Sequence, residues 1–89
     1  MPALLSRYPI ARSRGIGTIR VDSHWSRNIL EAHVAFGPDT LVVFVNHWPS
    51  KRHPESSRRA VARVLARRIR QLPSGADYVI AGDLNADYN

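Results

Sequence analysis

The chain has 89 residues, a hydrophobic fraction of 44% and a formal net charge of +6 at pH 7. This length allows one domain with a modest core and is short for a complete α/β enzyme, while the apolar content excludes a wholly disordered chain. No apolar run approaches the roughly 20 residues that cross a bilayer, and no signal-peptide pattern supports export, so the localisation stays open. Because cysteine is absent, a disulfide framework and a thiolate metal site are both excluded.

The positive charge is carried almost entirely by arginine, which supplies twelve of the 13 basic residues. Guanidinium groups form planar forks that match phosphate oxygens, so the excess favours polyanionic partners or phosphate-bearing substrates. An arginine is also an ordinary solvated helix residue, and that interpretation is favoured for any single position.

The first part of the chain contains short segments separated by turn formers. Residues 2–6 (PALLS) and 17–21 (GTIRV) predict two short strands. The arginine-rich stretch at 11–15 (ARSRG) predicts a basic turn between them.

Two firmer strands follow. Residues 29–36 (ILEAHVAF) alternate, which places Glu31 and His33 on the exposed face of a half-buried strand. The residues predicted to share its buried face are Leu30, Ala32, Val34 and Phe36. A GPDT turn then leads into residues 41–46 (LVVFVN), whose unbroken β-branched and aromatic run predicts a strand covered on both faces.

From Pro54 to about Leu72 the apolar period becomes that of a helix. Pro54 suits a first helical turn, and Pro73 with Gly75 suits a stop. The predicted apolar stripe consists of Val61, Val64, Leu65, Ile69 and Leu72. The predicted polar surface carries Arg58, Arg59, Arg63, Arg67 and Arg70.

Residues 78–81 (YVIA) predict a second buried strand after this helix. A crossover of that length makes the strands before and after it parallel, with a right-handed connection. If the two strands are neighbours, their carboxyl ends lie together, and His47 comes close to Asp83 and Asn85. Sheets of this kind bind ligands outside the carboxyl ends of their strands.

The polar group at this point has a definite chemistry. In an extended segment Asp83 and Asn85 point the same way, and Gly82 before them permits close backbone approach. An acid and an amide together hold a water or a hard cation such as Mg²⁺, and His47 is suited to donate a hydrogen bond to a phosphoryl oxygen. The purely structural alternative is a strand end followed by an Asx turn.

The motifs VNHWPSK at 45–51 and VIAGDLNAD at 79–87, separated by one amphipathic helix, resemble the endonuclease/exonuclease/phosphatase superfamily, which has the fold of deoxyribonuclease I. Two further segments agree in the same order: ALLSRYPI at 3–10 resembles the strand and turn after the metal-binding glutamate of that family, and SRNILEAHV at 26–34 resembles its arginine-led strand. The resemblance therefore runs through nearly the whole chain.

The resemblance implies a role for each matching residue. His47 corresponds to the histidine that contacts the scissile phosphate, Asp83 to the aspartate that activates or orients the attacking water, and Asn85 to the asparagine that fixes this aspartate and the phosphate. Arg27 resembles a phosphate-contacting arginine. Asp83 and Asn85 are also the candidate metal ligands, for Mg²⁺ or Mn²⁺. Asn46, Ser50 and Lys51 belong to the motif without a catalytic role, Trp48 is expected to pack, and Asp87 to lie in a solvated turn.

The family pattern also contains segments without a counterpart among the 89 residues: an early asparagine and a glutamate metal ligand, and a later aspartate and terminal Asp-His pair. We therefore expect residues 1–89 to form a partial domain of α/β (α+β sandwich) class. It would be part of a four-layer sandwich of two sheets with outer helices, with strands left uncovered.

The leading hypothesis is a fragment of a divalent-metal-dependent phosphoesterase, inactive as the isolated chain, that acts on a phosphodiester or phosphomonoester. The phosphate-containing substrate is left open among nucleic acid, a lipid headgroup and a small phosphoester. The alternative is a non-catalytic basic module that binds nucleic acid through the arginine-rich helix. His24, His33 and His53 have no partner at metal-ligand spacing and are interpreted as surface or turn histidines.

Overall fold

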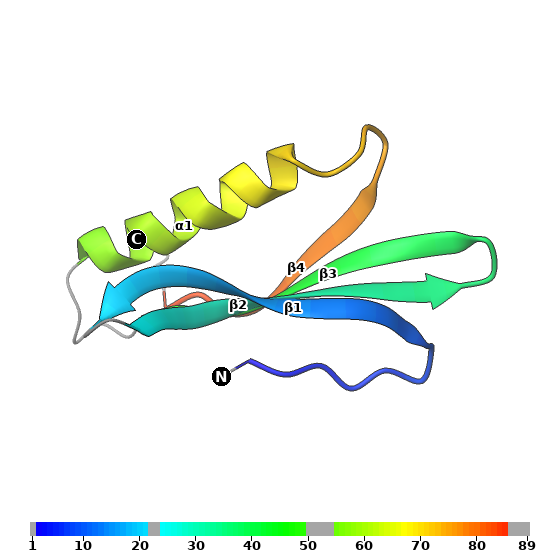
Figure 1. Cartoon of the computed structure of the whole chain (residues 1–89), viewed down its shortest axis with the longest axis horizontal. Coiled ribbons are helices and arrows are strands. Elements are labelled where there is room, and N and C mark those ends of the chain that lie inside the picture. The colour runs from blue at the N-terminus through cyan, green and yellow to red at the C-terminus, as the bar shows by residue number, and fades with distance from the viewer. Residues whose placement is uncertain (1, 22–23, 50–54, 86–89) are drawn as a thin grey trace.

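The computed structural model describes the backbone of residues 2–21, 24–49 and 55–85, with the side chains of residues 18–21 and 24–27 left out. These residues form one mixed sheet with a helix on one face (Figure 1). The elements are β1 (Ile10–Val21), β2 (His24–Phe36), β3 (Asp39–His47), α1 (Glu55–Arg70) and β4 (Asp77–Asp83).

The sheet has the strand order β1-β2-β3-β4. The first three strands are antiparallel neighbours, joined between β2 and β3 by a tight turn in which Gly37 has a φ of 60°, a conformation that favours glycine. The strands β3 and β4 are parallel and lie on either side of α1 in sequence. The predicted strand-helix-strand unit with parallel neighbouring strands is therefore confirmed, as is the α/β class.

The core lies between α1 and the sheet. The helix buries Val61 and Leu65 on its apolar stripe, against Ile29 of β2 and Phe44 of β3, and Ile69 and Leu72 pack partly buried beside them. Glu55 in the first turn, and Arg67, Arg68 and Arg70 in the last, complement the helix dipole. The predicted helix is confirmed over Glu55–Arg70, and all residues of its predicted stripe except Val64 belong to the core or pack against it.

The opposite face of the sheet is covered in part by the N-terminal segment, residues 2–9, which runs across it (Figure 1). The backbone N–H of Ala35 donates to the carbonyl of Pro9 at 2.9 Å, and the rings of Tyr8 and Phe36 lie 5.9 Å apart. Between this segment and β2 and β3 lies an apolar cavity of about 410 Å³. The segment is not a strand, so the strand predicted at 2–6 is wrong, and two prolines without N–H donors flank it.

The prediction of a basic turn at 11–15 is also wrong. Residues 10–21 form a single long strand that pairs with β2 along its length. Register shifts near Ile10 and near Gly17 absorb the irregular sequence as bulges, so the chain does not need a turn there. The strand predicted at 17–21 is the second half of β1.

The strand at 29–36 is confirmed within β2, but the prediction of which face is exposed is wrong. Glu31 and His33 are buried, with 1% and 9% of their surfaces exposed, because their face of the sheet is the one that α1 covers. The other face is buried only at Ala32 and Val34, and Phe36 stays exposed. The interpretation of His33 as a surface histidine is therefore wrong as well.

The strand predicted at 78–81 forms, as part of β4, but it is exposed rather than buried. Among the described strands it pairs with β3 alone, and every residue of β4 is exposed. Tyr78, Val79 and Ile80 leave 47%, 43% and 41% of their surfaces open, which makes β4 an apolar edge strand in the described part of the chain.

Candidate active site

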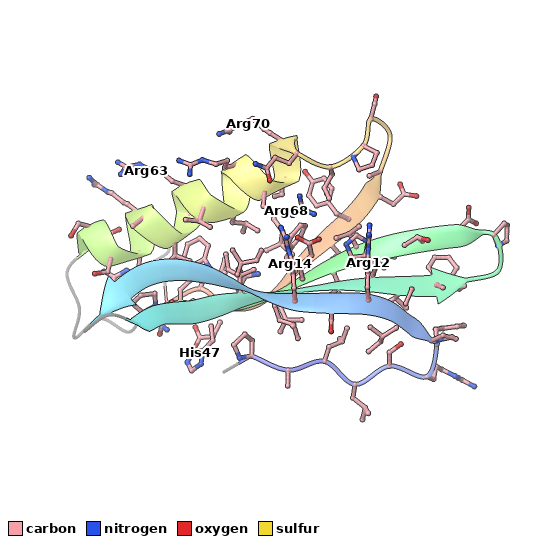
Figure 2. All side chains as sticks on the ribbon, viewed as in Figure 1. Arg12, Arg14, His47, Arg63, Arg68 and Arg70 are labelled. Atoms are coloured by element: carbon pink, nitrogen blue, oxygen red, sulfur yellow. The ribbon has the colours of Figure 1, made fainter. Side chains whose placement is uncertain are left out.

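The strands β3 and β4 end together, and their register pairs His47 with Asp83. Paired residues of parallel strands project to the same face of the sheet. Phe44 belongs to the core beneath the helix, so His47, an odd number of residues along, projects to the opposite face (Figure 2). The predicted meeting of His47 and Asp83 at the carboxyl ends of parallel strands is confirmed, and both side chains are exposed.

Gly82 allows the two strand ends to approach. Its φ is 115°, and a Cβ atom at this position would lie 2.0 Å from the carbonyl oxygen of Asn46, its partner in β3. No side chain fits that gap, so glycine is required both by the backbone conformation and by the contact. One residue further on, the carbonyl of Asp83 accepts a hydrogen bond from the N–H of Trp48 at 2.9 Å.

Asn85 is held on the same loop by two hydrogen bonds. Its backbone N–H donates to Asp83 Oδ1 at 2.9 Å, and its side-chain Nδ2 donates to the carbonyl of Trp48 at 2.7 Å. The first bond closes an Asx turn, and Asn85 has a φ of 49°, a left-handed conformation that asparagine tolerates. The turn considered as the structural alternative therefore exists, and it also holds the Asp83 carboxylate beside Asn85.

The buried side chain of Asn46 stabilises the ends of β3 and β4 through hydrogen bonds. It is 2% exposed, and its Nδ2 donates to the carbonyls of Phe44 and Ala81 at 2.9 and 3.1 Å. Its Oδ1 accepts the indole N–H of Trp48 at 2.9 Å, and the Trp48 ring packs partly buried against the core. Trp48 packs as expected, and Asn46 ties β3, β4 and the following loop together. On the other side, Asn28 of β2 donates to the carbonyl of His47 at 2.8 Å.

The group offers a small set of free polar atoms. Asp83 Oδ1 accepts the hydrogen bond of the turn and Asn85 Nδ2 donates to Trp48, so Asp83 Oδ2 and Asn85 Oδ1 have no hydrogen-bond partner among the described residues. Carboxylate and amide oxygens are ligands that Mg²⁺ accepts. Within residues 2–21, 24–49 and 55–85, no group of three or more His, Asp or Glu side chains converges to hold a metal ion. Asp83 and Asn85 therefore fit as contributors of oxygen atoms rather than as a complete metal site.

The remaining residues of the predicted site are described only in part or lie outside the described residues. Arg27 lies in β2 opposite Gly17, and its side chain is among those not described. Ser50, Lys51, His53 and Asp87 lie outside the described residues.

A second polar group was missed by the sequence analysis. Glu31 accepts hydrogen bonds from Arg68 Nε at Oε1 and from Arg68 Nη2 at Oε2, the latter at 2.8 Å, and His33 Nε2 lies 2.7 Å from Oε2. Arg14 Nε is 3.9 Å from Oε1. The pKa of Glu31 is lowered from 4.5 to about 2, mainly by the hydrogen bonds from Arg68 and also by that from His33, against the opposing effect of burial.

One signal in the sequence pointed to this pairing. Arg68 lies on the apolar stripe of α1, between Leu65 and Leu72 at helical spacing. A cation on a buried stripe needs an acidic partner, and Glu31 is the acidic residue of an otherwise apolar strand segment.

The two parallel strands joined by a covering helix form an α/β unit, and in sheets of this kind ligands bind outside the carboxyl ends of the strands, where these polar residues lie. The family model for the Endonuclease/Exonuclease/phosphatase family matches residues 2–89, and the chain belongs to this family. Membership indicates a hydrolase of the phosphoesterase or nuclease type and implies phosphate-containing substrates. No curated protein and no solved structure gave a significant match. Within the described residues, α1 is too short and too polar to span a membrane.

Proposed function

We propose that residues 1–89 are the part of a divalent-metal-dependent phosphoesterase that supplies His47, Asp83 and Asn85 to hydrolysis of a P–O bond by water. The observation that carries the proposal is the register of β3 and β4. It places His47 beside Asp83 on one face of the sheet, with Asn85 hydrogen-bonded to Asp83, in a chain that belongs to this family.

Each residue has a distinct task. Asp83 keeps Oδ2 free to accept a proton from the attacking water and to orient it, while the Asx turn holds its Oδ1. His47 donates to a phosphoryl oxygen and stabilises the charge that develops there. Asn85 uses its backbone N–H to fix Asp83, and Arg27 contributes a guanidinium group to the substrate phosphate.

Asp83 and Asn85 are the oxygen donors that this chain would contribute to a bound Mg²⁺ or Mn²⁺. The metal, when bound, supplies positive charge against the phosphoryl oxygens. We expect no appreciable turnover from residues 1–89 alone, because the family pattern assigns further ligands and a second catalytic histidine to other segments.

The same proposal assigns the chain to a four-layer sandwich of two sheets and outer helices. The exposed apolar side chains of β4 and the apolar cavity behind β2 and β3 support it, because strands with apolar residues on both faces are normally covered on both.

The test is kinetic and uses a protein in which this chain is joined to the segments with the remaining family ligands. With a generic phosphodiester and Mg²⁺, His47→Ala and Asn85→Ala should each lower kcat on the order of 10²-fold or more. Asp83→Ala should lower kcat far more than it raises KM, because orienting water matters mainly in the transition state. Arg63→Ala on the exposed helix surface is the matched control and should leave kcat unchanged. Full activity of the Asp83 variant, or activity that survives a chelator, contradicts the proposal.

The basic-module alternative has one structural observation in its favour. Four arginines of α1 have exposed side chains in the described structure: Arg59, Arg63, Arg67 and Arg70. Figure 2 shows Arg63 and Arg70 pointing away from the sheet. A phosphate-binding helix would be metal-indifferent and steeply salt-dependent. Loss of nucleic-acid binding in Arg63→Ala, with function intact in the Asp83 and His47 variants, would establish this alternative.

A further inference from the structure

We propose that the cleft between β1 and the C-terminal half of α1 is a binding site for a dianionic phosphate group, formed by Arg12, Arg14 and His33. The cleft is on the helix-covered face of the sheet, whereas His47 and Asp83 are on the opposite face, so it is distinct from the proposed active site and does not depend on it. The cavity measures about 120 Å³, which holds several water molecules or one tetrahedral oxyanion.

The register of β1 and β2 builds this cleft. Arg12 is paired with His33 and Arg14 with Glu31, so all four side chains project to the face that α1 covers. Figure 2 shows Arg12 and Arg14 rising from β1 on that side, with Arg68 reaching towards them from α1. The lining consists of these five residues and Ser13.

Glu31 organises the cleft without repelling an anion from it. Both of its oxygens are occupied, Oε1 by Arg68 and Oε2 by Arg68 and His33. Arg68 neutralises its charge, so Arg12 and Arg14 are in excess and leave the cleft with a net charge of two positive units before His33 is counted. Arg12 forms no hydrogen bond or ion pair with the described part of the chain, so its guanidinium group is available to a ligand.

His33 contributes a ring nitrogen to the cleft. The ionised carboxylate of Glu31 only accepts hydrogen bonds, so the proton of the neutral ring is on Nε2. Nδ1 has no partner in the described structure, and no buried side-chain nitrogen there is unsatisfied, so Nδ1 reaches solvent. Nδ1 therefore faces the space that a ligand of the cleft would occupy.

This donor set fits a phosphate monoester or inorganic phosphate better than a diester. The guanidinium groups of Arg12 and Arg14, together with the ring of His33, match a group that has two negative charges and three acceptor oxygens. The charged groups that face His33 are Glu31 and the arginines of β1 and α1, and β3 presents the apolar Val42 opposite.

The experiment titrates the 89-residue chain with inorganic phosphate, followed by ¹H–¹⁵N NMR of the backbone and the histidine rings. We expect saturable shifts at Arg12, Arg14 and His33, and Arg12→Gln combined with Arg14→Gln should weaken binding on the order of tenfold or more. The control, Arg63→Gln combined with Arg67→Gln, removes the same charge from the exposed surface of α1 and should leave the affinity within about twofold. Equal weakening in both pairs, or no saturation, overturns the proposal.

Two further arms test the role of His33 and the source of the phosphate. Inorganic phosphate is also titrated into His33→Gln, whose amide still donates to Glu31 but which lacks the Nδ1 atom. The affinity of this variant should fall, and an unchanged affinity would refute the role of His33. Phenyl phosphate in place of inorganic phosphate separates the sources: tighter binding identifies a monoester ligand, and weaker binding identifies free phosphate.

Discussion

Arg68→Met is the most informative test of how this fold is held together. The substitution keeps most of the aliphatic stem of the side chain and removes the guanidinium group that donates twice to Glu31. Glu31 is 1% exposed, so the substitution leaves a buried carboxylate without its main partner. We expect a large loss of stability rather than a local change.

The magnitude follows from the pKa of Glu31. A fall from 4.5 to about 2 corresponds to roughly 3 kcal/mol in favour of the folded state at neutral pH, at about 1.4 kcal/mol per pKa unit. Removing one partner of a buried pair typically costs about 3–5 kcal/mol. His33 at 2.7 Å and Arg14 at 3.9 Å remain, so the lower end, about 3 kcal/mol, is expected. Domains are commonly stable by only about 5–15 kcal/mol.

The assay is urea unfolding, followed by the fluorescence of Trp48 at the edge of the core. In the parent chain the contribution of Glu31 is fully present above pH 4.5 and is lost as the pH falls towards 2, because its pKa is lowered in the folded state. In Arg68→Met burial dominates and raises that pKa, so protonation favours the folded variant. The stability gap between the two proteins should therefore narrow as the pH falls below about 5.

Two controls make the result specific. Arg63→Met changes an exposed arginine on the same helix and should shift the free energy of unfolding by less than about 0.5 kcal/mol. Arg68→Met combined with Glu31→Leu removes both charges and should be more stable than Arg68→Met alone. A single variant within about 1 kcal/mol of the parent at pH 7, or a gap unchanged in acid, would refute the reasoning.

Three further predictions concern the candidate active site. Gly82→Ala should destabilise the chain by about 2 kcal/mol or more in urea unfolding, because its Cβ would lie 2.0 Å from the Asn46 carbonyl oxygen; a neutral effect would contradict the close approach. Asn46→Ala should cost about 1–3 kcal/mol by the same measurement, because the indole N–H of Trp48 and two main-chain carbonyls lose their partner. In the activity assay the double variant of His47 and Asp83 should be much less impaired than the product of the single effects, since both residues act on one phosphoryl group. Single effects on kcat that multiply in the double variant would contradict a shared role.

Much of the fold was predictable because it depends on patterns within single elements. The helical period of the stripe around Val61 and Leu65, the apolar run of β3 and the turn at Gly37 are local features. The length of the crossover between β3 and β4 makes them parallel, and because the two strands are also neighbours, His47 lies opposite Asp83. The placement of the candidate site could therefore be predicted from the sequence, apart from the hydrogen bonds that hold Asn85.

The errors concern contacts between elements far apart in the chain. Alternation in β2 separates Glu31 and His33 from Ala32 and Val34, but it does not determine which set lies beneath the helix. An acid and a histidine are favourable there only because Arg68, 37 residues later, donates to Glu31. For the same reason the arginines at 12 and 14 were interpreted as a turn, although pairing with β2 places them in a strand facing that pair.

The sequence alone determined the order of the elements, the parallel crossover and the arrival of His47 and Asp83 at one end of the sheet, because each follows from hydrogen-bonding geometry and the period of nearby side chains. Only the tertiary structure decided which face of the sheet α1 covers, and with it the burial of Glu31, the basic cleft around His33 and the exposure of β4. The physical reason is that the free energy of burying a side chain depends on its neighbours in space, and a charged residue changes from unfavourable to favourable when its partner is present.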